Sequence, residues 1–309
     1  MNKTTLIRNW SPKRPGYWKL YHQSHEHDMF EVFKAICELV ERFEPPWEVS
    51  PLGKPVKILP REYASLCIFR KWYNLTYRQT EDMAPLLIGK TVDHSSIGWA
   101  MQRISPQYLD ELVYDLHLYM DCVLKGGLYI TDSTGFACDR YEEREIAMEE
   151  TKVKQTVKLH AAVKYYPRYG VTTIVTGIVT HGTAHDSPLF KYLIRRIYGP
   201  APLFSDMGYD SEENRRLAYQ HLLIPMIKER ENCGNSLIRV KARKDFSEDL
   251  YKNFRGMVEG VFGGMETAYN NKTRCRLEKT RQTDVMLVAV VQNLKAHFKV
   301  LRLLKEVTY

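Results

Sequence analysis

The sequence lacks the features of membrane proteins, of disulfide-stapled domains and of structural zinc sites. Its six cysteines form no CxxC pair and show no Cys/His ligand spacing, so we expect reduced thiols. The longest apolar run, residues 285–291, is far too short to span a membrane. The first 18 residues have no apolar core of the kind that signal peptides contain. We therefore expect a soluble, intracellular protein with no membrane partner.

Positive charge is concentrated near the C-terminus. The chain carries a net charge of +8 and has 44% hydrophobic residues, a composition that is normal for a folded protein. Residues 232–309 hold 15 Lys and Arg against 8 Asp and Glu, whereas the preceding residues are almost neutral. Clusters of this kind suit a phosphate backbone, although a solvated basic face explains them equally well. The cluster residues that we expect to bind DNA are Arg239, Lys241, Arg243, Lys244 and Lys272.

The first part of the chain is predicted to be helical and interrupted by prolines. Residues 1–58 contain one amphipathic helix near 29–43, which Pro45 and Pro46 end, followed by a Pro-rich arm or linker. Residues 59–126 are predicted to form a compact helical domain. Its helices are expected at 61–72, 77–88, 93–104 and 107–123.

This helical domain has two interpretations. It could hold a helix-turn-helix that reads DNA, or it could be a bundle that only dimerises or supports the rest of the chain. In the first case the helix at 93–104 enters a groove, while its apolar side, which includes Ile97 and Met101, packs inward. The side chains presented to DNA would include Ser95, Ser96, Gln102 and Arg103.

Gly126 and Gly127 mark a change from helical to strand periodicity. Three strands are predicted first, at 128–132, 156–166 and 171–180, and the last two are expected to form an antiparallel hairpin. Next come a helix that begins at 185–188 and a strand at 201–206. A helix at 210–219 and a strand at 222–228 follow. This is the element order of an RNase H-like α/β domain, in which helices flank a mixed sheet, and it extends over residues 127–309.

Two acidic residues end strands that this topology makes parallel neighbours. Asp132 ends the first strand and Asp206 ends the fourth, so both would lie at one edge of the sheet. A pair of Mg²⁺ or Mn²⁺ ions about 3.5–4 Å apart needs carboxylate ligands, and such pairs assist phosphoryl transfer. A lone Asp at a strand end is usually a turn or capping residue, but the pairing favours a site for two metal ions.

A third carboxylate is expected from a helix near the same edge. We interpret residues 248–264 as one helix, in which Tyr251 and Arg255 share a stripe and Glu259 lies at its margin. Glu259 could then reach the strand ends. The simpler alternative is an ordinary i,i+4 helix pair between Arg255 and Glu259. Lys228 and Arg230, just past the last strand, are further candidates for contact with DNA, or else belong to a solvated turn.

Three sequence blocks resemble those of insertion-sequence DDE transposases of the four/five type. They are TDSTGF around Asp132, FSDMGYDSEENRR around Asp206 and FRGMVEGVFGGM around Glu259, and the three acids are separated by 74 and 53 residues. A Gly-Tyr pair after the second acid and an Arg four residues before the third, here Arg255, are typical of the family. The segments SLCIFRKWYNLTYRQTEDMAPLL and VVQNLKAHFKVL also resemble it, so the likeness extends over roughly residues 60–305.

The chain departs from the four-type signature near the third acid. Where that signature often has Tyr and Lys, the chain has Lys252 and Glu266. Tyr251 and Lys272 are the nearest substitutes, and Glu266 is a minor rival for the role of third acid.

The resemblance implies a transposase that binds the terminal inverted repeats of its element, cleaves the 3′ ends and joins them to target DNA. Asp132, Asp206 and Glu259 would hold two Mg²⁺ or Mn²⁺ ions, and Arg255 would contact double-stranded DNA. The protein would act as a homodimer in the prokaryotic cytoplasm, associated with the nucleoid. The alternatives are a catalytically retired transposase that serves as a DNA-binding or architectural protein, and an RNase H-like nuclease that acts on other structures.

Overall fold

The computed structural model describes residues 28–50, 55–138, 156–231 and 233–307. The first 27 residues of the expected N-terminal arm, and part of its Pro-rich linker, lie outside the described residues. Within the described ranges, every helix is too short or too polar to cross a membrane. Free thiols, as expected, are found at Cys37, Cys67, Cys122, Cys233 and Cys275.

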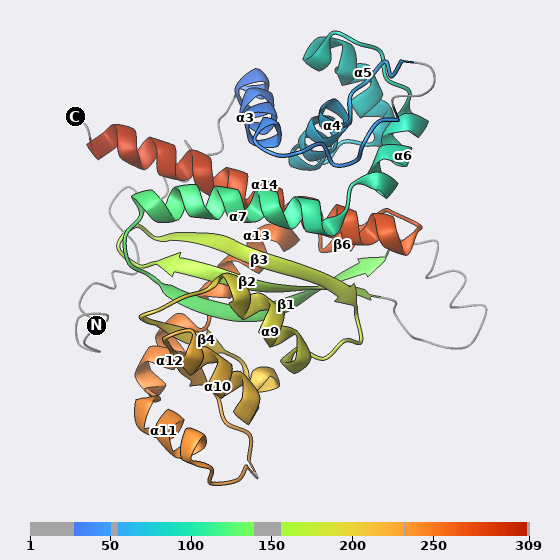
Figure 1. Ribbon diagram of the computed structural model, residues 1–309. Coiled ribbons are helices and arrows are strands. Elements are labelled where there is room, and N and C mark those ends of the chain that lie inside the picture. The colour runs from blue at the N-terminus through green and yellow to red at the C-terminus, as the bar shows by residue number, and fades with distance from the viewer. Residues whose placement is uncertain (1–27, 51–54, 139–155, 232, 308–309) are drawn as a thin grey trace, which may run out of the picture.

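Helices form the N-terminal part of the chain and pack on both faces of one sheet (Figure 1). The N-terminal and C-terminal helices are α3 (Met29–Glu41), α4 (Pro60–Trp72), α5 (Tyr77–Ile88), α6 (His94–Arg103), α7 (Pro106–Val123), α12 (Glu248–Phe254), α13 (Met257–Tyr269) and α14 (Glu278–Val307). The helices between β3 and β5 are η1 (Ser187–Leu189), α9 (Phe190–Leu193), η2 (Ile194–Arg196), η3 (Met207–Tyr209) and α10 (Glu212–Gln220), and α11 (Leu237–Asp245) follows β5.

The sheet is mixed and has six strands in the order β3-β2-β1-β4-β5, with β6 paired to the end of β1. Strands β1, β2 and β3 are antiparallel neighbours, whereas β1, β4 and β5 run parallel. The strands are β1 (Leu128–Cys138), β2 (Thr156–Tyr166), β3 (Val171–His181), β4 (Ala201–Ser205), β5 (Leu223–Ile227) and β6 (Lys272–Thr273). This arrangement confirms the expected mixed sheet and is consistent with an RNase H-like fold.

Two apolar clusters cover the two faces of the sheet. Successive residues of β1 point to opposite faces, so Ile130 joins the cluster under α7 and α14, while Tyr129 joins the cluster that contains Phe190 of α9. Figure 1 shows α7 and α14 crossing one face, with α3 to α6 above them and α9 and α10 on the other side. The first cluster continues into α3, α4 and α6, so the helical unit shares its core with the sheet.

A buried asparagine completes the hydrogen bonding at a defect in the sheet. Between β2 and β3 the pairing shifts, because Ile174 pairs with Val163 and Thr176 with Ala162, which leaves Val175 as the extra residue of a β-bulge. Asn293 of α14 accepts from the N–H of Ile174 at 2.8 Å and donates to its carbonyl at 2.7 Å. The amide of Asn293 therefore satisfies backbone groups that the bulge would otherwise leave unpaired.

Most of the expected elements are confirmed, including the hairpin of β2 and β3 and the parallel pair of β1 and β4. The apolar side of the helix expected at 93–104 is buried, with Ile97 and Met101 both 0% exposed. The first strand, however, extends to Cys138 rather than ending at Asp132, because it pairs with β2 as far as Ala137 and with β6 at its last two residues. The helix expected after Asp186 is broken into η1, α9 and η2.

The prediction of one continuous helix over 248–264 is wrong. The structure has α12 and α13, and Arg255 and Gly256 form the turn between them. The N–H of Arg255 donates to the carbonyl of Tyr251, whereas the N–H of Glu259 donates to Gly256, one residue short of helical spacing. A hydrogen bond between residues three apart, rather than four, interrupts the α-helical pattern at Gly256, so the two helices are separate.

A buried ion cluster joins the helical unit to the last helix. Asp284 of α14 lies 2.9 Å from the guanidinium of Arg70 and 2.8 Å from the ammonium of Lys71, both on α4, and its side chain is 5% exposed. Burial raises the pKa of Asp284, but Lys71 and Arg70 outweigh it and lower the pKa below its usual value. The carboxylate is therefore ionised at neutral pH, and it holds α4 against α14.

We expect Asp284→Asn to lower the free energy of unfolding by about 3–5 kcal/mol, because it leaves two buried cations without their carboxylate. Urea denaturation followed by circular dichroism measures this. The matched control is Glu38→Gln in α3, which breaks an exposed i,i+4 pair with Lys34 and should cost less than about 0.5 kcal/mol. Equal, small losses in the two variants would show that the buried cluster contributes little.

Candidate functional site

The parallel pairing of β1 and β4 brings the first two predicted acids to one edge of the sheet. The last paired residues of β1 and β4 are Thr131 and Ser205, whose hydroxyls lie 2.6 Å apart, and each is followed directly by an acid, Asp132 or Asp206. Each carboxylate then accepts from the N–H of the following residue, Ser133 at 2.9 Å and Met207 at 2.8 Å. Both side chains are therefore oriented by local backbone.

The turn between α12 and α13 brings the third acid to the same place. Glu259 lies in the first turn of α13, where a carboxylate also interacts favourably with the helix dipole. Just before α13, the hydroxyl of Tyr251 donates to the carbonyl of Ser205 at 3.4 Å, which ties α12 to the end of β4. This contact fixes the position of α12 relative to the end of β4, directly before Asp206.

The guanidinium of Arg255 contacts all three acids. It lies 2.8 Å from Glu259, 3.3 Å from Asp132 and 3.7 Å from Asp206. The i,i+4 pair of Arg255 and Glu259 therefore exists, but it is one part of a larger cluster. Three carboxylates from three separate elements surround a single positive group.

Burial makes the three acids different from one another. The side chain of Asp132 is 15% exposed, whereas those of Asp206 and Glu259 are 50% and 65% exposed. Burial raises the pKa of Asp132, the Ser133 N–H and Arg255 lower it, and the charges of Asp206 and Asp186 raise it again, with a net increase. The protein therefore holds a carboxylate where its negative charge is poorly compensated.

This donor set suits a divalent cation. Hard cations such as Mg²⁺ prefer carboxylate oxygens and keep part of their water shell, which matches three acids of which two face solvent. Arg255 acts as a stand-in cation, since its guanidinium reaches an oxygen of each acid. Asp132, Asp206 and Glu259 are the side chains that could hold such an ion.

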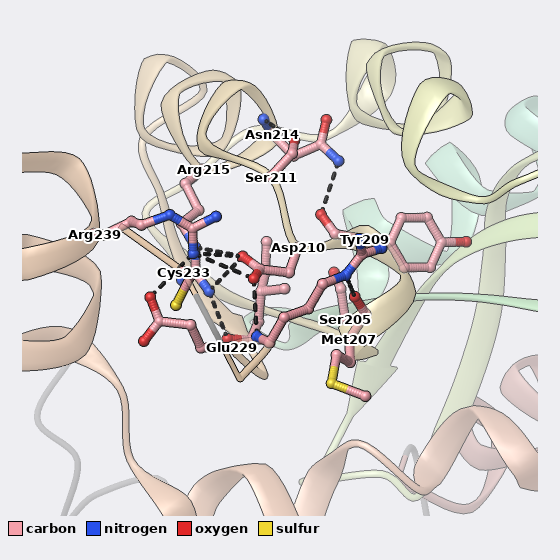
Figure 2. A network of polar contacts seen from close by, with 12 residues as sticks. Ser205, Met207, Tyr209, Asp210, Ser211, Asn214, Arg215, Glu229, Cys233 and Arg239 are labelled. Atoms are coloured by element: carbon pink, nitrogen blue, oxygen red, sulfur yellow. Dashed lines mark hydrogen bonds and ion pairs between the residues drawn. The ribbon is translucent and has the colours of Figure 1, made fainter. Parts of the chain in front are cut away.

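A buried polar network holds the segment that follows Asp206 (Figure 2). The carboxylate of Asp210, 0% exposed, contacts the guanidinium groups of Arg215 at 3.0 Å and Arg239 at 3.1 Å. It also accepts from the N–H of Arg230 at 3.0 Å, while the side chain of Arg230 reaches the carbonyl of Met207 at 3.4 Å. Asp210 does not cap α10, because Ser211 is its N-cap, and Asp210 is instead the centre of this network.

Some of the residues expected to bind DNA take part in internal ion pairs. Arg239 contacts Glu229 at 3.0 Å in addition to Asp210, and Arg243 contacts Glu229 at 2.7 Å. Their charges are thus partly compensated within the fold. The neighbouring Lys241, whose ammonium lies 4.0 Å from the centre of the Tyr219 ring, and Lys244 are exposed.

Other candidates for DNA contact lie after β5, at β6 and on α6. Lys228 is exposed directly after β5, and because β5 is parallel to β4, it lies at the same sheet edge as Asp206. Lys272 begins β6, beside the end of β1. The remaining candidates lie on α6, away from the acids: Ser95 and Gln102 are exposed, Ser96 is half-buried and Arg103 stacks on Trp99 at 4.1 Å.

One acidic residue near the site has a role that its sequence position concealed. Asp186 precedes η1, the usual place of a helix cap, but its side chain makes no capping hydrogen bond. Its carboxylate instead contacts Lys158 and His160 of β2. The alternation of polar residues at 158 and 160 was the available signal, but only the folded sheet shows their common partner.

The chain also matches a known family. A family model described as a transposase DDE domain matches residues 124–294, which is more than half of the chain and includes all three acids. A search of curated proteins found no match.

We expect Asp132→Asn to raise the thermal unfolding midpoint of the protein in EDTA at pH 7. An acid whose pKa is raised by folding destabilises the fold above that pKa, and asparagine removes this penalty. The gain should shrink as the pH falls through the folded-state pKa and vanish below 3.8, where the wild-type carboxyl is protonated in both states. Differential scanning calorimetry across pH measures it, with Asp82→Asn at an exposed position of α5 as control. A gain that is independent of pH would contradict this explanation.

Proposed function

Since the chain belongs to the family of transposases with a DDE domain, whose substrate is DNA, we propose that it binds the terminal inverted repeats of its own element, cleaves their 3′ ends and transfers them to target DNA. The observation that carries this proposal is the convergence of Asp132, Asp206 and Glu259 on the one guanidinium of Arg255. Three acids that repel each other are gathered where a divalent cation would neutralise them.

In this proposal Asp132, Asp206 and Glu259 are the ligands of two Mg²⁺ or Mn²⁺ ions. When bound, such ions increase the nucleophilicity of the attacking oxygen and stabilise the leaving oxygen of an in-line displacement at phosphorus. The buried Asp132 supplies a rigid ligand, and the exposed Asp206 and Glu259 leave the open side of the site to DNA. The protein's own contribution is to position the reacting groups.

We assign the backbone contacts to the basic residues around the site. Lys228 lies at the sheet edge of the acids, and Lys272 follows α13, so both suit phosphates of the DNA that enters the site. On α11 the exposed Lys241 and Lys244 are better suited to DNA than Arg239 and Arg243, which face Glu229.

The helical unit would recognise the element ends through α6. The exposed residues Ser95, Gln102 and Arg103 lie opposite its buried side, as a groove-reading helix requires. Action on two ends implies a homodimer on DNA, in the prokaryotic cytoplasm and in association with the nucleoid.

We expect Glu259→Gln to reduce metal-dependent cleavage of a duplex containing an element end by at least about 100-fold, because even indirect supports of metal ligands are worth about 10–100-fold. Asp132→Asn and Asp206→Asn should do the same. Cleavage is measured on end-labelled duplex with Mg²⁺ or Mn²⁺, with a duplex of unrelated sequence for comparison.

Glu266→Gln is the matched control, since Glu266 is exposed on the same helix α13. It should cleave like the wild type. Loss of activity in Glu266→Gln with retention in Glu259→Gln would reverse the assignment of the third acid. Equal cleavage by the wild type and Asp132→Asn would contradict the metal site, and cleavage without preference for element ends would favour a general nuclease.

We expect Arg255→Gln to bind Mn²⁺ more tightly than the wild type in the absence of DNA, by roughly three- to tenfold. A metal ion that enters the wild-type site must displace a guanidinium from three partly exposed carboxylates, and such contacts are worth about 0.2–1 kcal/mol each. Isothermal titration calorimetry measures the affinity. The same variant should cleave DNA less well, because it has lost a cation that can move to a phosphate.

The control for this experiment is Lys252→Gln, which removes an exposed cation of α12 that pairs only with Glu248 among the described residues. Its affinity for Mn²⁺ should equal that of the wild type. Weaker binding by Arg255→Gln would show that the arginine orders the acids rather than competing with the metal.

A further inference from the structure

A polar cluster lies behind the proposed metal site, on the other face of the sheet. Its centre is Asp186, whose Oδ1 is 2.8 Å from the ammonium of Lys158 and 2.8 Å from Nδ1 of His160. We propose that Asp186 is a positioning residue that sets the spacing of Asp132 and Asp206, and thereby the affinity of the site for divalent cations. This inference rests on the proposed function of the acids.

The cluster is built into the sheet. Lys158 and His160 are two residues apart on β2, so they point to the same face, and His160 pairs in register with Ser133 of β1. The side chain of His160 is 0% exposed, and its Nε2 lies 2.9 Å from the hydroxyl of Thr180 on β3. Asp186 is thus held by a buried partner that has little freedom to move.

Asp186 is connected to the first acid through Ser133. The hydroxyl of Ser133 is close enough to the carboxylate of Asp186 to lower its pKa. The N–H of the same residue donates to Oδ1 of Asp132 at 2.9 Å. Because adjacent residues of a strand point to opposite faces, Ser133 faces Asp186 while Asp132 faces Arg255. A displacement of Ser133 would therefore turn the peptide that orients Asp132.

Asp186 is connected to the second acid through Gly208. A Cβ atom at Gly208 would lie 3.3 Å from Oδ2 of Asp186, a contact tighter than an ordinary van der Waals approach. Gly208 belongs to η3, the turn whose N-cap is Asp206. The carboxylate of Asp186 therefore lies beside the segments that follow both acids, and its contacts with Lys158 and His160 attach it to β2.

A helix-capping role does not account for this arrangement. Asp28 and Asp93 accept hydrogen bonds from the first turns of their helices, whereas Asp186 makes no side-chain bond to η1. Burial raises the pKa of Asp186, but His160, Lys158 and Ser133 lower it by more, so the pKa lies well below its usual range. The carboxylate remains ionised wherever divalent cations bind, and its contacts persist.

The test is calorimetric titration of the full chain with Mn²⁺ in the absence of DNA. Asp186→Asn should bind Mn²⁺ about 10–100-fold more weakly than the wild type, the range found for residues that orient metal ligands. The matched control is Asp121→Asn: Asp121 contacts Lys164 of the same strand β2 at 2.6 Å, away from the three acids. It breaks a comparable ion pair and should leave the affinity unchanged.

A second variant keeps the inference testable if Asp186→Asn does not fold. Gly208→Ala preserves every charge but places a Cβ 3.3 Å from Oδ2 of Asp186, so that Asp186 and η3 must shift slightly relative to each other, and it should also weaken binding of Mn²⁺. Wild-type affinity in folded Asp186→Asn and in Gly208→Ala would overturn the inference. Wild-type affinity in Asp132→Asn would instead overturn the proposed metal site, so the two failures are distinguishable.

Discussion

Repulsion among three carboxylates is the constraint on which the rest of this structure depends. Asp132 and Asp206 follow directly after the paired residues Thr131 and Ser205, and Glu259 is added by the turn between α12 and α13. Their charges would separate if the elements were free to move. They are held together because each is attached to a rigid element and because the guanidinium of Arg255 compensates part of the charge. A site of this kind is costly to maintain and is suited to a cation.

The fold supplies that rigidity in layers. Apolar residues of α7 and α14 cover one face of the sheet, and Asn293 repairs the backbone hydrogen bonding at the bulge of β3. Asp284 extends the same support to the helical unit through Arg70 and Lys71. Nearer the acids, Asp210 holds the segment after Asp206 through buried ion pairs, and Asp186 lies on its other side, against the buried His160. The surroundings of the three acids are thus held in place largely by other carboxylates, which would not themselves contact metal or DNA.

Charge alone did not separate basic residues with internal partners from those available to DNA. Arg239 and Lys241 belong to one short cluster in the sequence, but α11 turns the first toward Asp210 and leaves the second exposed. A guanidinium that faces two carboxylates has already lost much of its attraction for a phosphate. The partners lie some ten to thirty residues away in the chain, which is why a count of charges along the sequence could not identify them.

The sequence by itself determined the elements and the acids. Strand periodicity predicted β1 to β5, the order of elements predicted that β1 and β4 are parallel neighbours, and that order was sufficient to pair Asp132 with Asp206. Local patterns could do this because side-chain alternation and capping act over a few residues. Only the tertiary structure decided where α12 ends and α13 begins, that Arg255 reaches all three acids, and that Asp186 faces Lys158 and His160 rather than its own helix. These contacts join residues far apart in the chain, and their energies depend on burial and distance, which exist only once the chain has folded.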